Sequence, residues 1–225
     1  MFSRIQLLAD PQTIAERFDV IADTGTFLPS NEITGFDHAL HPVITNNNSG
    51  LLCGNYRWGL VPPDWKKRPA DIWNHTISAK LEYIGRRYAW HKVSLNRCLV
   101  PVTGYFEYHW NDPKGKSKTK YIMTDAAETL FALAGLFSVW IDLEGKPLHT
   151  FAICTTEANE TMAFVHNKDV KRNYHRMPVM LNKADEKDWL DPSIPYMDFS
   201  FPNYKPNLIA TVADVGTATQ PTLFG

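Results

Sequence analysis

Residues 96–110 read NRCLVPVTGYFEYHW. Two runs rich in β-branched and aromatic residues, 98–103 and 105–110, flank Gly104, and this pattern predicts two consecutive strands. Because side chains alternate between the two faces of a strand, Glu107 shares its face with a tyrosine and a histidine, opposite three further aromatic side chains. The stretch therefore predicts β-structure that carries a carboxylate among aromatic rings.

The rest of the chain indicates many strands and few helices. Asp10-Pro11 precedes an apolar stripe and predicts a short helix, since aspartate caps helices and proline fits their first turn. Asn46 to Gly50 is typical of a turn between two strands, which predicts a hairpin. Helices are also predicted over residues 157–165 and 182–190. Further strands are predicted over residues 42–45, 51–60, 120–124, 130–141, 150–155, 177–181 and 208–213.

This order of elements predicts the fold class. Many strands, few helices and 15 prolines favour an α+β fold with a curved, largely antiparallel mixed sheet or an irregular β-barrel and a few short helices. A chain of 225 residues can bury one core, and no repeat or linker interrupts it, so residues 1–225 are expected to form a single domain. The proline-rich residues 191–225 are expected to pack on this domain as a C-terminal extension.

Composition argues against several classes of protein. The sequence has no run of the roughly 18 apolar residues that a membrane helix needs, and residues 1–20 carry five charges where a signal peptide would be apolar. The three cysteines, Cys53, Cys98 and Cys154, are far apart and lack metal-ligand spacing, which argues against a disulfide framework or a zinc site. We therefore expect a cytoplasmic monomer that uses neither a membrane, a metal nor a cofactor.

Charge is segregated along the chain. Three windows, residues 66–97, 112–124 and 166–176, together hold 16 Lys or Arg and 4 acidic residues, whereas the remaining 169 residues hold 7 and 20. If these windows meet on one face, they form the positive surface expected of a polyanion binder. The alternative is that they are solvated loops. For residues 114–118, which read KGKSK, this alternative is favoured because a hairpin tip carries the same residue types.

Glu107 and His166 are the candidate chemical groups. A carboxylate among aromatic residues is partly desolvated, which favours its protonated form and makes it a candidate general acid. The alternative for Glu107 is a half-exposed residue at a sheet edge. His166 follows the predicted helix 157–165, a position where a lone histidine is commonly a cap or a surface residue. The two residues could form an acid/base pair, although their spacing does not show that they meet.

The chain resembles the SOS-response-associated peptidase (SRAP) family, whose members process abasic sites in single-stranded DNA. The resemblance covers most of residues 1–190, and its stretches follow one another in the family's order. They are RWGLVPPDW (57–65), ISAKLEYI (77–84), NRCLVPVTGYFEYHW (96–110), FALAGLFSVW (131–140), TTEANETMAFVHN (155–167) and RMPVML (176–181). The resemblance implies a curved mixed sheet with a DNA groove, and single-stranded or abasic DNA as the partner.

The resemblance also implies roles for individual residues. It implies that Glu107 and His166 are the active-site glutamate and histidine. An inserted-looking stretch, residues 168–174, follows His166 and leaves His175 as the second choice for the histidine.

The resemblance further implies a DNA-binding groove. Arg4, Lys80 and Arg176 match its phosphate-binding arginines, and the lysine keeps the charge but loses the bidentate fork. Trp65 is similar to a family tryptophan at the groove, where an aromatic ring supports an unstacked base.

Two positions depart from the family pattern. Family members carry a cysteine at position 2, whose amine and thiol form a stable thiazolidine crosslink with the abasic aldehyde, and here the residue is Phe2. The asparagine that helps hold the abasic sugar is replaced by Ser78, with Asn74 upstream as a less favoured substitute. We therefore expect an inherited abasic-site pocket without the stable crosslink, in which remaining catalysis uses a reversible imine of the Met1 amine. The alternatives are a non-catalytic single-stranded DNA-binding protein and a diverged copy that has lost its DNA function.

Overall fold

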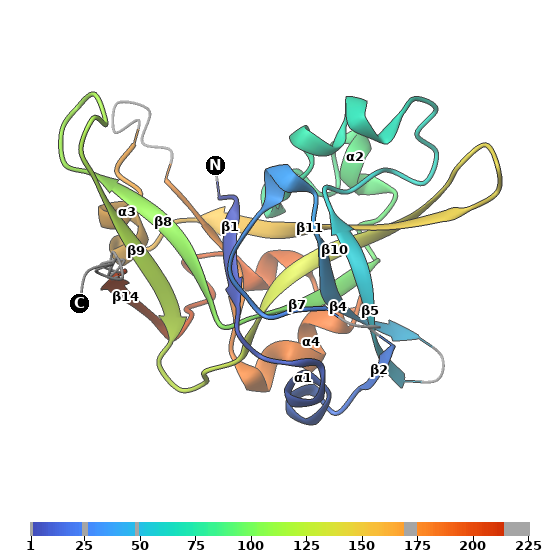
Figure 1. The fold of residues 1–225 in the computed structure, drawn as a ribbon, viewed down its shortest axis with the longest axis horizontal. Coiled ribbons are helices and arrows are strands. Elements are labelled where there is room, and N and C mark those ends of the chain that lie inside the picture. The colour runs from blue at the N-terminus through green and yellow to red at the C-terminus, as the bar shows by residue number, and fades with distance from the viewer. Residues whose placement is uncertain (1, 24–26, 48–49, 169–174, 214–225) are drawn as a thin grey trace, which may run out of the picture.

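The computed structural model describes residues 2–23, 27–47, 50–168 and 175–213, and its strands form two sheets (Figure 1). The smaller sheet is antiparallel at each of its pairings. Its strands lie in the order β14 (Leu208–Val212), β9 (Lys118–Asp125), β8 (Gly104–Trp110), β1 (Arg4–Leu7) and β3 (Ser30–Thr34). The predicted strand 105–110 is therefore confirmed, and it lies at the centre of this sheet.

The larger sheet closes into a barrel. Its nine strands are β2 (Ile21–Asp23), β4 (Leu40–Asn47), β5 (Gly50–Trp58), β6 (Ser78–Lys80), β7 (Arg97–Val102), β10 (Phe131–Ile141), β11 (Pro147–Glu157), β12 (Arg176–Pro178) and β13 (Met180–Leu181). Strands β11, β10, β7, β4 and β5 pair antiparallel in that order. β5 then pairs back to β11 in parallel, at Thr150↔Arg57 and Phe151↔Trp58, and closes the ring. The expected α+β class, with a largely antiparallel sheet or irregular barrel, is confirmed.

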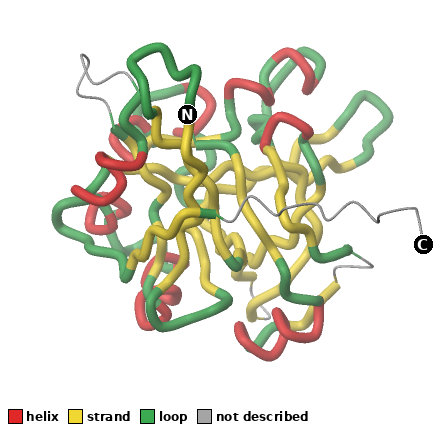
Figure 2. Tube along the Cα trace, turned by 60° about the vertical axis from the view of Figure 1, so that its left-hand side comes forward, coloured by secondary structure: helices red, strands yellow, loops and turns green. Residues whose placement is uncertain are grey.

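The helices are short and lie around the strands. The α-helices are α1 (Pro11–Phe18), α2 (Tyr88–His91), α3 (Glu160–Val165) and α4 (Glu186–Leu190). Short 3-10 helices span Gly35–Asp37, Pro69–Asp71, Trp73–His75, Leu81–Tyr83, Lys183–Asp185 and Tyr196–Phe199. The predicted cap of α1 is confirmed, because the Asp10 carboxylate accepts a 2.8 Å hydrogen bond from the Thr13 N–H. Figure 2 shows helices at the periphery and strands through the middle of the molecule.

The predicted helix 157–165 is wrong at its start. β11 continues through Glu157, which pairs with Arg176 of β12 and is thereby held in extended backbone. The helix begins only where Asn159 caps it, with a side-chain oxygen that accepts a 2.9 Å hydrogen bond from the Met162 N–H. Pairing between distant segments thus overrides local helix propensity here.

The predicted strand 177–181 is likewise two short strands, β12 and β13. They pair with different partners, β11 and β10, on either side of Val179. The Val179 N–H donates to the Cys154 carbonyl and its own carbonyl accepts from the Ala134 N–H, so this residue bridges both neighbours.

An aromatic cluster joins the two sheets near the start of the chain. Phe2 is only 2% exposed. Its ring meets Tyr105 of β8 edge-on at 5.4 Å and lies 6.2 Å from Trp58 of β5. Trp58 in turn stacks on Phe151 of β11 at 5.9 Å. Burying rings of this size contributes strongly to stability, so Phe2 fixes the entry of the chain into β1.

Residues 191–213 pack on the rest of the chain. The buried Arg97 side chain donates to the carbonyls of Asp191 at 3.0 Å and Ile194 at 2.7 Å, and its guanidinium lies 5.1 Å from the Trp189 ring. β14 then pairs with β9 and extends the smaller sheet. Residues 214–225 lie outside the described part of the chain.

No helix in the described ranges is long and apolar enough to cross a membrane.

Candidate functional site

A cleft of about 400 Å³ lies at the edge of β8, and we call it the β8 cleft. β1 begins at Arg4 and pairs with β8 at Tyr105 and Gly104, so the edge of β8 beyond Tyr105 is not paired with β1. The cleft forms at this uncovered edge. It is lined by Ser3, Arg4, Phe106, Glu107, Tyr108, Trp110, Lys118, His166 and Lys168.

The structure brings Glu107 and His166 together in this cleft. His166 Nδ1 lies 3.1 Å from Glu107 Oε2, with the two side chains 9% and 14% exposed, respectively. His166 Nδ1 has no hydrogen-bond partner among the described residues, so the two groups are within ion-pair distance but not aligned as donor and acceptor. A carboxylate and an imidazole at this distance can pass a proton to or from a bound molecule.

Local structure explains how the two residues meet. Glu107 is fixed by the pairing of β8 with β9, opposite Tyr121. His166 ends α3, where its N–H donates a 2.7 Å hydrogen bond to the Met162 carbonyl. Met162 and Val165 are fully buried and anchor that helix against the aromatic core.

Asn167 completes this arrangement, and its role was not predicted. Its Oδ1 accepts a 2.7 Å hydrogen bond from the Trp110 N–H, and its Nδ2 donates a 2.9 Å bond to the Trp110 carbonyl. The side-chain amide thus pairs with the uncovered edge of β8 as a neighbouring strand would. Asn167 directly follows His166, so this pairing also holds the imidazole beside Glu107.

Four cations lie near the cleft, each beside an aromatic ring of β8. Arg4 lies 5.9 Å from the Tyr108 ring and Lys120 lies 4.0 Å from the Phe106 ring. Both cations pair with the Glu32 carboxylate. Burial alone raises the pKa of that carboxyl, but the hydrogen bonds from Lys120 and Arg4 outweigh it and lower the pKa below its usual value.

The other two cations lie by a single ring. Lys118 Nζ is 5.1 Å and Lys168 Nζ 5.4 Å from the centre of the Trp110 ring. The favoured prediction for residues 114–118 is a solvated hairpin tip. Lys114 and Lys116 lie exposed in the turn between β8 and β9, as predicted, whereas Lys118 is exposed but begins β9 and lines the cleft.

A second cleft, of about 380 Å³, contains Arg176 and His175. Arg176 donates to both oxygens of Glu82, at 2.5 and 2.9 Å, and to the Thr155 carbonyl at 2.7 Å. Lys80 lies beside this cleft, with its Nζ 5.8 Å from the ring of Tyr83, which lines it. Desolvation and the charge of Arg176 lower the pKa of Lys80. The structure thus places the predicted phosphate contacts in two groups, with Arg4 in the β8 cleft and the other two around the second cleft.

The histidine candidates link the two clefts. The His175 ring nitrogen Nδ1 donates a 2.5 Å hydrogen bond to the main-chain carbonyl of His166, and the two rings lie 6.5 Å apart. It is His166, not His175, that approaches Glu107.

Ser78, Asn74 and Trp65 are absent from the lining of either cleft. Ser78 is half-buried in β6, paired with Ile153 of β11, and Asn74 hydrogen bonds to the His38 ring at 3.0 Å. Trp65 donates its indole N–H to the Arg68 carbonyl and its ring centre lies 6.4 Å from that of Tyr88. Their predicted roles in DNA binding stay predictions.

The three cysteines are buried and unpaired as disulfides. Burial raises the pKa of the Cys53 thiol to about 12 and raises the pKa of the Cys98 and Cys154 thiols well above the usual range. Thiolates do not form at such positions near neutral pH. Within the described ranges, no group of three or more His, Cys, Asp or Glu residues is placed to hold a metal ion.

Comparison with known proteins identifies the family. The abasic site processing protein YoqW of Bacillus subtilis (strain 168) is 33% identical over 195 residues, which is 85% of this chain and 81% of the relative. YoaM, an abasic site processing protein of the same organism, is also 33% identical over 195 residues, which is 85% of this chain and 80% of YoaM. A crystal structure of a protein from Bacteroides thetaiotaomicron shares the fold, with a TM-score of 0.81 at 24% identity over 94% of this chain and 92% of that one. The sequence model of the SOS response associated peptidase (SRAP) family matches residues 1–201, and the chain therefore belongs to this family.

Proposed function

We propose that this protein processes abasic sites in single-stranded DNA, with Glu107 and His166 as its acid/base pair. The observation that carries the proposal is the 3.1 Å approach of these two side chains inside a cleft. Arg4 and Lys118 line the same cleft and supply positive charge for DNA phosphates. Bacillus relatives at about one-third identity over most of the chain are named abasic site processing proteins.

The chemistry starts from the ring-opened abasic sugar, which carries an aldehyde at C1′. A primary amine of the protein adds to that carbon and, with loss of water, forms an imine. Removal of a C2′ proton then forms the C2′=C3′ double bond as the C3′–O bond to the phosphate breaks. Glu107 and His166 serve to accept and return these protons. Hydrolysis of the imine frees the amine for another turnover.

We further propose that no stable thiazolidine crosslink forms. A thiazolidine needs an amine and a thiol on neighbouring carbons, and position 2 holds Phe2, whose ring is buried between Tyr105 and Trp58. The thiols of the sequence are themselves buried with raised pKa values. Met1, the predicted source of the amine, lies outside the described residues, while Lys118 and Lys168 are amines that line the cleft.

The second candidate is a protein that binds single-stranded DNA without reacting with it. The observation that favours it is the burial of Phe2 at the position where the family carries its nucleophile, beside a cleft that keeps its cations. In that case the β8 cleft would hold the lesion and shield it.

The test uses the full chain and a single-stranded oligonucleotide with one abasic site, beside an undamaged oligonucleotide of equal sequence. Strand cleavage is followed on denaturing gels, and imines are trapped with borohydride. We expect a trapped adduct only with abasic DNA. Glu107→Gln is expected to lower cleavage at least tenfold, since one member of the proton-transfer pair is lost. Glu144→Gln, a change at an exposed carboxylate in the turn between β10 and β11, is the matched control.

The outcomes separate the candidates. Abasic DNA that is bound but neither cleaved nor trapped contradicts the acid/base proposal and supports the non-catalytic binder. Absence of binding even at low salt contradicts both and leaves a diverged copy without DNA function. An adduct that survives heating without borohydride would overturn the proposed absence of a stable crosslink.

A further inference from the structure

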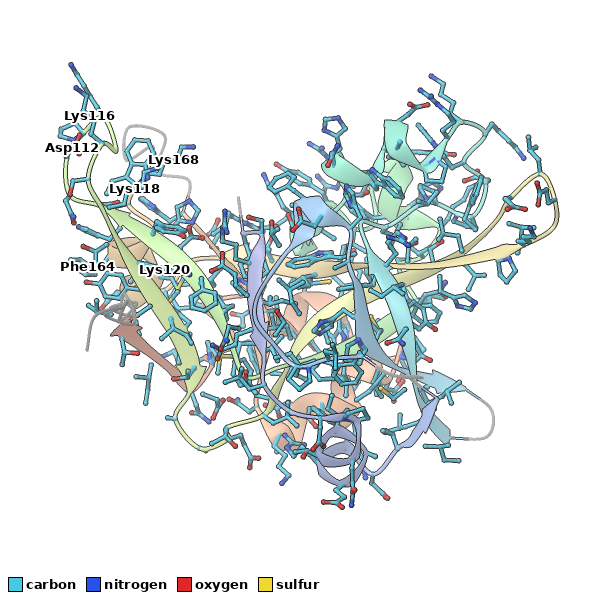
Figure 3. The ribbon with its side chains drawn as sticks, in the orientation of Figure 1. Asp112, Lys116, Lys118, Lys120, Phe164 and Lys168 are labelled. Atoms are coloured by element: carbon cyan, nitrogen blue, oxygen red, sulfur yellow. The ribbon has the colours of Figure 1, made fainter. Side chains whose placement is uncertain are left out.

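Trp110 is the last residue of β8 and directly precedes the turn that joins β8 to β9. It is directly opposite Lys118 in the β8–β9 register. Lys118 Nζ and Lys168 Nζ approach the same ring, at 5.1 and 5.4 Å from its centre. Figure 3 shows both lysines at the tip end of the hairpin, with Lys120 farther along it.

The indole is held in place before any ligand arrives. Both main-chain groups of Trp110 are hydrogen bonded to the Asn167 amide. Gly115, in the hairpin turn with φ +63, packs so closely that a Cβ there would lie 2.6 Å from the ring. A ring that is already ordered loses little conformational entropy on binding, which favours its use as a platform.

Among the residues that the structure describes, no carboxylate pairs with the two lysines beside Trp110. Lys118 and Lys168 are both exposed, and neither forms an ion pair with a residue in the described part of the chain. By contrast, Arg4 and Lys120 share Glu32. The nearest acidic residue of the turn, Asp112, accepts hydrogen bonds from the N–H groups of Lys114 and Ser117.

We propose that Trp110, Lys118 and Lys168 form a subsite for the nucleotide next to the abasic residue. The base stacks on the indole and the adjoining phosphate lies between the two ammonium groups. This combination of an aromatic platform and cations is what binds single-stranded nucleic acid without base preference, because every base has a π-face. The inference rests on the proposed function, since it takes the residue beside Glu107 to be the lesion.

The binding test uses a tetrahydrofuran analogue of the abasic site, which has no aldehyde and therefore cannot react. Oligonucleotides carry three thymidines on the 5′ side, on the 3′ side, or on both sides of the analogue. We expect one flank to add affinity in the wild type. Trp110→Leu is expected to remove roughly 10- to 100-fold of affinity for that flank, whereas Trp110→Phe keeps most of it.

The charge test follows affinity against salt concentration. Each phosphate contact on a single strand contributes about −0.7 to the slope of log K against log salt. Because the two lysines share one phosphate in this subsite, the double variant Lys118→Ala, Lys168→Ala is expected to make that slope shallower by about 0.7. Lys187→Ala removes an exposed lysine from α4 and is the matched control, with an expected slope equal to that of the wild type.

Thermal unfolding of each variant shows whether it is folded. Trp110→Phe keeps an aromatic ring, so it shows whether a loss of binding in Trp110→Leu comes from the missing ring or from disruption of the hairpin. The subsite is overturned if Trp110→Leu keeps the affinity gain of both flanks, or if the double lysine variant keeps the wild-type slope. The proposed function is tested by a separate experiment, the cleavage of natural abasic DNA by the wild type and by Glu107→Gln. It fails if the wild type does not cleave that DNA. If the flanking thymidines add affinity that depends on Trp110 but abasic DNA is not cleaved, the subsite proposal stands and the proposed catalytic function is rejected.

Discussion

The side-chain amide of Asn167 forms two hydrogen bonds with the main chain of Trp110, one to its N–H at 2.7 Å and one to its carbonyl at 2.9 Å. This pairing occupies the edge of β8 at Trp110, beyond the residues that pair with β1. It also fixes the residue before it, His166, opposite Glu107. One amide therefore connects the proposed acid/base pair to the proposed tryptophan platform.

Asn167→Ala is expected to lower both stability and processing. Two half-buried main-chain groups would lose their partners, which costs about 1–3 kcal/mol in the free energy of unfolding. Processing should fall at least tenfold even where the variant is fully folded, because the imidazole loses its anchor. Urea unfolding and cleavage of abasic oligonucleotides measure the two effects. Asn203→Ala, at an exposed turn, is the control, and equal processing by both variants would contradict the positioning role.

Gly115→Ala is expected to displace the Trp110 ring. A left-handed backbone conformation costs an alanine roughly 1 kcal/mol. The added methyl would also lie 2.6 Å from the indole. Gly145→Ala is a matched control, since that glycine has φ +80 and open space around it. We expect Gly115→Ala to lose more stability than Gly145→Ala and, unlike it, to weaken DNA binding; equal losses in the two variants would contradict the clash.

The buried His41 is expected to make the protein less stable at acidic pH. The side chain is fully buried, its Nε2 donates a 2.8 Å hydrogen bond to the Pro101 carbonyl, and burial lowers its pKa to about 4. The unfolded chain takes up this proton near pH 6.5, so stability is full above that pH and falls as the pH drops toward 4, by up to about 3 kcal/mol. Urea unfolding between pH 7 and 4 measures the decline. His41→Leu should flatten it, whereas His75→Leu, at an exposed position, should not.

Much of the fold could be predicted from local patterns. Alternation and turn residues give β8, the β4–β5 hairpin and the cap of α1. Where the prediction is wrong, long-range pairing decides. Glu157 belongs to a strand rather than a helix because it pairs with Arg176 of β12. The short strand β6 forms because Ser78 and the two residues after it pair in parallel with β11.

The site was predictable only in part. Glu107 and His166 stand out as residue types, but their contact depends on how α3 packs against β8, which no spacing in the sequence shows. Composition alone predicts a solvated tip for residues 114–118, because it does not distinguish turn residues from strand residues. The register of the β8–β9 pairing makes this distinction, because it places Lys118 in the strand opposite Trp110.

Glu82→Gln tests whether Arg176 contacts DNA. Burial alone raises the pKa of the Glu82 carboxyl, but hydrogen bonds from Arg176 outweigh it and lower that pKa, so the pair is charged at neutral pH. Removing the carboxylate charge leaves Arg176 and Lys80 to attract a phosphate. We expect tighter binding to single-stranded DNA at low salt and a salt slope steeper by about 0.7. An unchanged slope would assign Arg176 a structural role, and Glu144→Gln controls for net charge.

The double variant Phe2→Cys, Ser78→Asn is expected to restore a stable crosslink. It places an amine and a thiol on neighbouring carbons when residue 2 is made the first residue, and it returns the asparagine that the family uses near the sugar. Phe2 is buried against Tyr105 and Trp58, so replacing its ring by a small side chain costs about 3 kcal/mol, and the assay is run well below the unfolding temperature. A heat-stable adduct from the double variant alone, lost again on adding Glu107→Gln, would mean that the β8 cleft still accepts the lesion and lacks only the thiol. If a folded double variant forms no adduct, the cleft does not bring the abasic aldehyde to position 2, and the proposed site is wrong.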